Sequence, residues 1–268
     1  MTSLSTLYLD RTGGKIAYDD TGDGPLVIML PGMGPLRSEY RYLSPSLAKA
    51  GYRAVTADLR GQGESTPIWR SYSIKDVGED LLALIGHIDA GPAHVICTSM
   101  SPSAAVWAAT EKPDNFESMT LIAPFVRDVP PSLLQRIGLS LFLRGPWRVW
   151  GWITYYGSLY PTSKPPDYKE YIQNLRDNLK EPGRFEAMMK LGSASKKASE
   201  ERLGKVVTRS MVIMGTKDPD WTDPVSEAKY VADQLSAKLF LVEGAGHYPQ
   251  TEMPEKVVPV ILEFLSQS

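Results

Sequence analysis

The stretch HVICTSMSPSAA, residues 94–105, joins an apolar run to a dense group of small hydroxyl residues. Its first half predicts a buried strand, and the segment from Pro102 onward predicts a helix. A tight turn between a strand and a helix lifts one side chain clear of the backbone and points backbone N–H groups at the same place. That geometry suits a nucleophilic serine, which needs an exposed oxygen and N–H donors for an oxyanion.

Two serines of this stretch fit the turn. The backbone folds back on itself there, so the residues two positions before and two positions after the nucleophile must be small. Both Ser99 and Ser101 meet this condition. The residue after the nucleophile must also donate its N–H, which Met100 has and Pro102 lacks. Ser99 is therefore the predicted nucleophile and Met100 a predicted oxyanion donor, while an ordinary helix N-cap is the alternative role of Ser99.

A catalytic serine needs a histidine to take its proton. Of the three histidines, His87 falls in an amphipathic helical pattern, and His94 begins the strand of the nucleophile at the wrong end. His247 follows the last apolar run of the chain in the glycine-rich segment VEGAGHYPQ. Such a loop can carry a side chain over the ends of the strands, so His247 is the predicted base.

The histidine in turn needs an acid that orients its ring. The segment VIMGTKDPDWTDP offers Asp218, Asp220 and Asp223 between the serine and the histidine. Asp218 comes soonest after the predicted strand, behind Gly215, and is the predicted acid.

Short apolar runs alternate with helical patterns along most of the chain. This alternation predicts a mostly parallel β-sheet flanked by helices. After a hairpin at residues 7–18, strands are expected in segments 25–32, 52–65, 93–99, 118–124, 209–215 and 237–244, with helices at 76–88 and 254–265.

The block from residue 125 to residue 206 breaks the alternation, because it contains helical patterns and no convincing strand. These patterns begin near Leu133, Tyr168 and Phe185. We expect a helical lid at 125–206, inserted into a core formed by 1–124 and 207–268.

Aromatic residues gather in the first part of this block. They are candidates for lining an apolar substrate pocket, although packing inside the lid is an alternative role for the same rings. The selected pocket residues are Trp147, Trp150, Trp152 and Tyr156.

The composition excludes several classes of protein. The 268 residues include 29 Lys and Arg against 31 Asp and Glu, so no positive charge excess points to nucleic acid. No run of about 18 uncharged apolar residues predicts a membrane span. The segment MTSLSTLYLDRTGG lacks the order of a secretory signal, and the single Cys97 excludes an internal disulfide. We expect a cytoplasmic monomer or homodimer that acts on a small molecule.

Five segments, in their order along the chain, resemble the α/β-hydrolase superfamily in its lidded esterase and epoxide-hydrolase-like branch. The resemblance covers essentially all residues, and the order of serine, acid and histidine is that of the family. The segments are Pro31–Met33, Asp58–Ser65, Ser99, Gly215–Asp218 and Gly246–His247.

The resemblance implies an α/β-hydrolase fold and a catalytic triad of Ser99, Asp218 and His247. It also implies that the backbone N–H of Met33 is the second oxyanion donor. The chain departs from the family in having Pro-Gly in place of His-Gly before Met33, and Cys-x-Ser-x-Ser in place of Gly-x-Ser-x-Gly. With Pro-Gly before it, Met33 still has a backbone N–H that can donate. With Cys97 and Ser101, the positions two before and two after Ser99 still hold small residues.

The implied activity is hydrolysis of a small apolar ester, thioester or lactone through an acyl-enzyme on Ser99. No metal and no organic cofactor is expected. A serine nucleophile, rather than an aspartate, argues against the dehalogenase and epoxide-hydrolase reactions. The alternatives are a carbon–carbon bond hydrolase or a cofactor-free perhydrolase on the same triad, and a ligand receptor or regulator with slow or no turnover.

Overall fold

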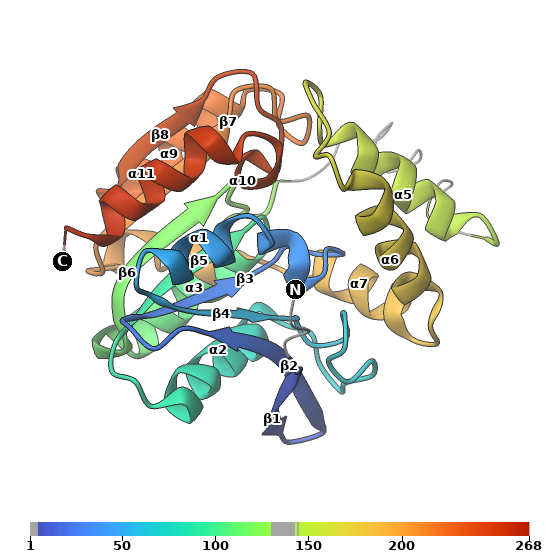
Figure 1. Ribbon diagram of the computed structural model, residues 1–268, viewed down its shortest axis with the longest axis horizontal. Coiled ribbons are helices and arrows are strands. Elements are labelled where there is room, and N and C mark those ends of the chain that lie inside the picture. Colours follow the sequence, from blue (N-terminus) through green and yellow to red (C-terminus); the bar gives the residue numbers. More distant parts are fainter. Residues whose placement is uncertain (1–4, 130–142, 144, 268) are drawn as a thin grey trace.

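The computed structural model of the chain describes residues 5–129, 143 and 145–267. Its strands are β1 (Leu7–Arg11), β2 (Gly14–Thr21), β3 (Leu26–Leu30), β4 (Arg53–Ala57), β5 (Ala93–Thr98), β6 (Phe116–Ile122), β7 (Ser210–Gly215) and β8 (Lys238–Val242). Within the described residues they form one eight-stranded sheet in the order β1-β2-β4-β3-β5-β6-β7-β8 (Figure 1). β2 is antiparallel to β1 and β4, and the other neighbouring pairs are parallel. The predicted mostly parallel sheet is confirmed.

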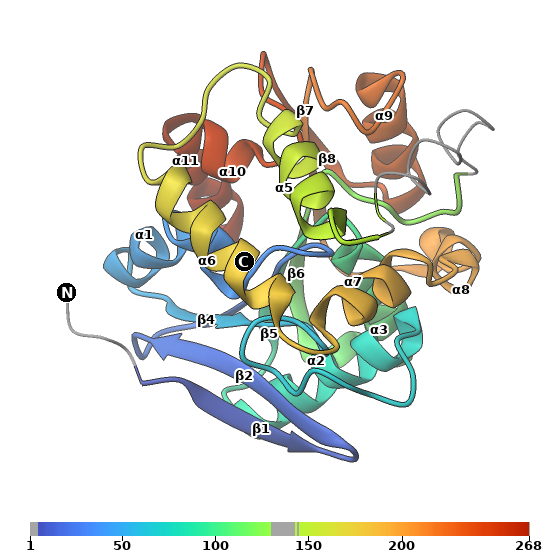
Figure 2. The same cartoon turned by 90° about the vertical axis from the view of Figure 1, so that its right-hand side faces the viewer.

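Helices flank both faces of this sheet. They are α1 (Leu43–Lys49), α2 (Ile74–Ile88), α3 (Ser101–Glu111), α5 (Arg148–Ser158), α6 (Tyr168–Lys180), α7 (Arg184–Gly192), α8 (Lys197–Glu200), α9 (Pro224–Leu235), α10 (Pro249–Glu252) and α11 (Pro254–Leu265). α1 and α11 pack together on one face, α3 and α9 lie on the other, and α2 packs along α3 (Figures 1 and 2). None of the helices in the described part is long and apolar enough to cross a membrane.

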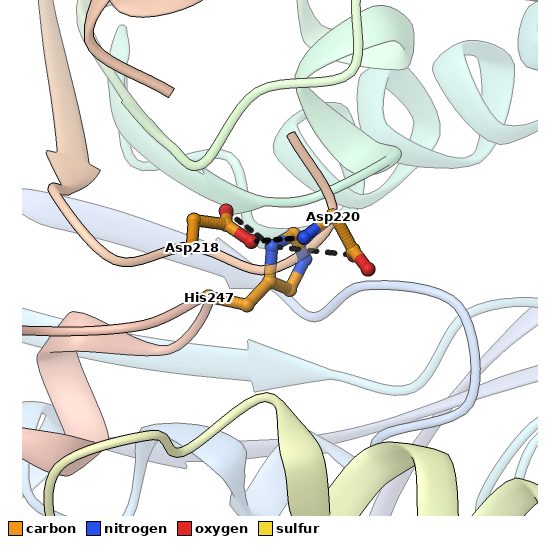
Figure 3. A group of neighbouring side chains, drawn as sticks. All are labelled: Asp218, Asp220 and His247. Carbon is orange, nitrogen blue, oxygen red and sulfur yellow. Dashed lines mark hydrogen bonds and ion pairs between the residues drawn. The ribbon is translucent and has the colours of Figure 1, made fainter. Parts of the chain in front are cut away.

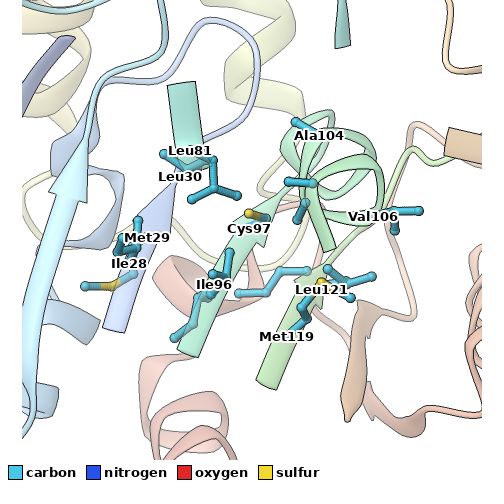
Figure 4. Packing of buried hydrophobic residues seen from close by; sticks show 14 of the residues in the cluster. Ile28, Met29, Leu30, Leu81, Ile96, Cys97, Ala104, Val106, Met119 and Leu121 are labelled. Carbon is cyan, nitrogen blue, oxygen red and sulfur yellow. The ribbon is translucent and has the colours of Figure 1, made fainter. Parts of the chain in front are cut away.

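The core explains why the parallel strands appear in the sequence as unbroken apolar runs. Strands covered by helices on both faces bury every side chain, and β3, β5 and β7 are buried along their whole length. Figure 4 shows Ile28, Ile96 and Met119 of three neighbouring strands in one cluster with Leu81 of α2 and Ala104 of α3. This packing holds the carboxyl ends of the parallel strands at one edge of the sheet.

Between β6 and β7 the described residues form helices and no strand. α6 and α7 confirm the helical patterns that begin at Tyr168 and near Phe185. The pattern that begins near Leu133 lies outside the described residues. Helices α5 to α7 stand together at one end of the sheet, on the right in Figure 1. They share a second apolar cluster, which also includes Tyr248 from the loop after β8.

The segment DLRGQGES, residues 58–65, ties together the loops at this edge of the sheet. The buried carboxylate of Asp58 accepts hydrogen bonds from the backbone N–H groups of Arg37, at 2.7 Å, and Glu64, at 3.0 Å. It also pairs with the guanidinium of Arg37. The amide of Gln62 donates to the carbonyl of Gly32 at 3.1 Å and accepts from the N–H of Gly34. The segment therefore fixes the loop of residues 31–34.

This arrangement predicts a large effect of Asp58→Asn on stability. The change removes the buried carboxylate from the mostly buried Arg37 guanidinium, which keeps its pairs with Asp19 and Glu64. The free energy of unfolding should therefore fall by roughly 1.5–3 kcal/mol, the size of a hydrogen bond to a charged group. Urea denaturation followed by circular dichroism measures the change. Asp10→Asn is the control, since the Asp10 side chain is 84 % exposed and its pair with Lys15 is worth about 0–1 kcal/mol. Similar losses in both variants would contradict the role given to Asp58.

Candidate active site

Ser99 stands where β5 ends and α3 begins, and its backbone has a φ of 63°. This left-handed conformation is uncommon for a residue with a side chain. Gly32 makes room for it, because a Cβ on Gly32 would lie 2.7 Å from the Cβ of Ser99. The N–H of Ser99 donates to the carbonyl of Ile122 at 2.9 Å, and its carbonyl accepts from the N–H of Phe125 at 2.8 Å. The turn is therefore held from both sides.

The other hydroxyl and thiol groups of this stretch are enclosed. Ser101 and Ser103 are fully buried, and each hydroxyl donates to a backbone carbonyl, that of Ser101 to Pro31. Cys97 is also fully buried, and burial raises the pKa of its thiol. Of these side chains, only Ser99 reaches the cavity described below.

His247 and Asp218 meet at the carboxyl ends of β7 and β8 (Figure 3). Nδ1 of His247 lies 2.7 Å from a carboxylate oxygen of Asp218, and both side chains are almost completely buried. Gly215 allows the two loops to approach, since a Cβ there would lie 2.4 Å from the carbonyl oxygen of Ala245 and 2.1 Å from that of Gly246. The sequence-predicted acid and base are thus in direct contact.

A second carboxylate, that of Asp220, stands beside this pair (Figure 3). One of its oxygens lies 3.6 Å from Nδ1 of His247, and its backbone N–H donates to Asp218 at 3.0 Å. Its other oxygen accepts a hydrogen bond from the hydroxyl of Tyr155 on α5. Burial raises the pKa of the Asp220 carboxyl. The sequence analysis considered Asp220 only as a rival to Asp218, whereas the structure places both at the same ring.

The electrostatics of this group favour a protonated imidazole. Burial disfavours the charged ring and would lower the pKa of His247. The negative charges of Asp218 and Asp220, and the hydrogen bond to Asp218, outweigh burial and raise this pKa to about 9. The group therefore stabilises the positive charge that an imidazole acquires when it accepts a proton.

Met33 and Met100, the two residues predicted to supply oxyanion donors, both line the cavity at Ser99. Among the described residues, neither backbone N–H donates to another protein group. Both can therefore donate to an oxygen bound beside Ser99. Met33 lies in the loop that Gln62 fixes, and Met100 is the residue before α3.

A buried polar network behind this loop was not anticipated from the sequence. Glu39 is 1 % exposed and accepts hydrogen bonds from the amide of Gln250 at 2.6 Å and from the N–H of Gly32 at 3.5 Å. Burial raises the pKa of Glu39 to about 7, although hydrogen bonds from Thr98 and Gly32 oppose the rise. The network connects the end of β5, just before Ser99, to the 31–34 loop and α10. No motif marks an isolated glutamate of this kind.

An open cavity of about 1290 Å³ joins these parts. Ser99 and His247 both line it, and no hydrogen bond joins these two described residues. Catalytic hydrogen bonds are often long in enzymes without bound substrate. Phe125 and Trp221 also line it, with their ring centres 4.4 Å apart. The sequence analysis did not select these two rings, although both follow strands that end at this edge.

The four aromatic residues selected from the sequence fall in three different places. Trp152 lines the cavity and is 2 % exposed. Trp147 and Trp150 are 54 % and 60 % exposed and lie outside the described lining. Tyr156 is fully buried in the second apolar cluster, where its ring contacts that of Tyr248. Of these four residues, only Trp152 therefore lines the described cavity.

One group in the described part of the chain has the spacing of metal ligands, namely Asp218, Asp220 and His247. Its donor atoms are already engaged with one another. Nδ1 of His247 is at hydrogen-bond distance from Asp218, and the other oxygen of Asp218 accepts from the N–H of Asp220. This geometry is that of an oriented imidazole, and we assign no metal to it.

Known proteins resemble this chain over most of its length. A model of the alpha/beta hydrolase family matches residues 27–260. A 3-oxoadipate enol-lactonase of Acinetobacter baylyi is 23% identical over 97% of both chains. A 2-hydroxy-6-oxononadienedioate/2-hydroxy-6-oxononatrienedioate hydrolase of Burkholderia vietnamiensis is 26% identical over 96% of this chain and 92% of its own.

Among solved structures, a thermophilic esterase from Thermogutta terrifontis superimposes with a TM-score of 0.81, at 23% identity over 98% of both chains. This likeness supports the fold. The family match covers the sheet from β3 to β8 and the loops that carry Ser99, Asp218 and His247. The chain belongs to the α/β hydrolase family.

Proposed function

We propose that this protein is a serine hydrolase that cleaves a small ester, thioester or lactone through an acyl-enzyme on Ser99. The observation that carries the proposal is the convergence on one cavity of the left-handed Ser99, the Asp218–His247 pair and the N–H groups of Met33 and Met100. Each part matches one need of acyl transfer: a nucleophile, an oriented base and oxyanion donors.

In the proposed reaction, His247 removes the proton of the Ser99 hydroxyl as Oγ bonds to the acyl carbon. The oxyanion accepts hydrogen bonds from Met33 and Met100, and the loss of one such donor typically costs ~10²–10³ in rate. His247 then gives its proton to the leaving group as the acyl–leaving-group bond breaks. His247 next removes a proton from water as the water oxygen bonds to the acyl carbon, and returns it to Oγ of Ser99 as the acyl–Oγ bond breaks and the acid leaves. Asp218 holds the ring and stabilises its charge throughout.

The block at 125–206 is proposed to act as the lid that shapes the acyl pocket. Tyr155 and Trp152 line the cavity from α5. The backbone N–H of His247 donates a hydrogen bond to the carbonyl of Leu159, the residue after α5, at 3.0 Å. The full-length relatives are named for an enol-lactone and for 2-hydroxy-6-oxo dioates. A carbonyl compound therefore suits the chemistry proposed at Ser99.

The first test concerns the nucleophile. Ser99→Ala should abolish covalent labelling by a fluorophosphonate, because the reactive oxygen is removed. Ser101→Ala and Ser103→Ala should keep it, since both hydroxyls are buried on backbone carbonyls. Gel fluorescence after labelling gives the result, and circular dichroism checks folding. Labelling that survives in Ser99→Ala and disappears in Ser101→Ala would move the nucleophile.

The second test concerns the acid. Asp218→Asn should lower kcat on p-nitrophenyl esters by ~10³–10⁴, because the imidazole loses the partner that fixes its tautomer. Asp177→Asn, on the exposed face of α6, is the matched control and should keep the parent kcat. Normal turnover by Asp218→Asn together with loss in Asp220→Asn would make Asp220 the acid.

The third test is the pH profile. Only the neutral imidazole accepts a proton, so kcat/KM should rise with pH through the pKa of His247, about 9. Asp220→Asn removes a negative charge that raises this pKa. The rise in kcat/KM should therefore move to lower pH in the variant. An unchanged profile, or a shift to higher pH, would show that Asp220 does not act on the ring.

A further inference from the structure

The loop that carries Met33 is held by the core of the protein on either side of this residue. The amide of Gln62 donates a hydrogen bond to the carbonyl of Gly32 at 3.1 Å and accepts one from the N–H of Gly34. Between them lies the backbone N–H of Met33, the proposed oxyanion donor. The loop then continues to Leu36, where its support comes from a different part of the molecule.

The backbone of Leu36 is bonded to helix α6. Its N–H donates a hydrogen bond to the hydroxyl of Tyr171 at 3.2 Å. In the described part of the chain this N–H has no other acceptor. The carbonyl of Leu36 accepts from the N–H of Glu39 at 2.8 Å, so both backbone groups of Leu36 are engaged. The hydroxyl of Tyr171 therefore joins α6 directly to the loop that carries Met33.

Tyr171 is itself fixed in place. Its side chain is almost fully buried, and its ring centre lies 6.0 Å from that of Tyr156. The guanidinium of Arg41 lies 4.5 Å from the centre of the Tyr171 ring and pairs with Asp167, the residue before α6, at 2.6 Å. Burial raises the pKa of the Tyr171 phenol, so the hydroxyl stays neutral. The Leu36 N–H thus meets an acceptor that is held rigidly.

Helices α5 and α7, which stand beside α6 in Figure 1, pack against the same loop. A Cβ on Gly34 would lie 2.5 Å from the ring of Trp152, a residue of α5. A Cβ on Gly192, the last residue of α7, would lie 2.1 Å from Sδ of Met33. All three helices therefore contact the loop. Of these three contacts, only that of Tyr171 is a hydrogen bond to a backbone group.

We propose that Tyr171 is a positioning residue for the reaction at Ser99. Its hydroxyl holds Leu36, and through Leu36 the backbone of Met33, where the Met33 N–H donates to the oxyanion. The oxyanion site is then complete only when α6 is docked on the core, so the helices between β6 and β7 act on the chemistry as well as on the pocket. This inference rests on the proposed function, because it requires an oxyanion beside Ser99.

The size of the expected effect follows from how strictly such a donor must be placed. A misplacement of about 1 Å can cost ~10² in rate, and loss of a whole oxyanion donor costs ~10²–10³. Without the Tyr171 hydroxyl, the Met33 N–H is still present and Gln62 still holds the residues beside it. We therefore expect a smaller loss, of roughly tenfold.

The test is Tyr171→Phe, which keeps the ring and removes only the hydroxyl. On p-nitrophenyl esters, kcat should fall roughly tenfold with KM nearly unchanged, because an oxyanion donor acts mainly in the transition state. The rate constant of fluorophosphonate labelling should fall by a similar factor. Tyr168→Phe is the matched control on the same helix, since the Tyr168 hydroxyl has no hydrogen-bond partner among the described residues. It should keep the parent kcat and labelling rate.

Amide hydrogen exchange, followed by NMR, connects the rates to the loop. The Leu36 N–H should be protected in the parent and in Tyr168→Phe, and should exchange faster in Tyr171→Phe. Circular dichroism shows whether each variant folds. An unprotected Leu36 N–H in the parent would overturn the inference without any variant.

The kinetic outcomes separate this inference from the proposed function. A parent-like kcat in folded Tyr171→Phe, a higher KM with unchanged kcat, or an equal loss in Tyr168→Phe would overturn the role of Tyr171. Absent fluorophosphonate labelling in the parent would contradict the proposed function itself. Normal labelling in the parent with an equal labelling rate in Tyr171→Phe would contradict only the positioning role.

Discussion

The left-handed backbone of Ser99 is the constraint on which the candidate site depends. A side-chain-bearing residue in this conformation costs about 1–3 kcal/mol, so its surroundings must impose it. Gly32 leaves space for the serine, and the buried hydroxyl of Ser101 holds the carbonyl of Pro31 in the adjacent loop. Met100, whose N–H is the proposed oxyanion donor, is the next residue in the same turn and lines the cavity. The proposed nucleophile and one proposed oxyanion donor thus depend on one backbone conformation.

The sheet supplies the second half of the site through its loops. Parallel strands end at one edge, and the loops after β7 and β8 place Asp218 against His247 there. The 31–34 loop after β3 is fixed by Gln62 on one side and by the buried Glu39 on the other. Residues distant in sequence therefore reach one cavity because each follows a parallel strand that ends at this edge of the sheet.

The sequence predicted the parts of this arrangement that follow from local rules. The missing N–H of Pro102 selects Ser99, and loop position after a strand selects His247. Contacts that depend on how helices pack over the sheet could not be read in the same way. The hydrogen bond from Tyr155 to Asp220 and the burial of Tyr156 are two such contacts. Periodicity shows which face of a helix is apolar, but it does not show what that face covers.

In the proposed site, the turn at Ser99 presents the nucleophile and the N–H of Met100, and the 31–34 loop supplies the N–H of Met33. The most direct test is a crystal structure of the protein after reaction with an alkyl fluorophosphonate. The account predicts phosphorus bonded to Oγ of Ser99, with the phosphonyl oxygen about 2.7–3.1 Å from the backbone nitrogens of Met33 and Met100. An adduct on another residue, or a phosphonyl oxygen directed away from both nitrogens, would contradict it.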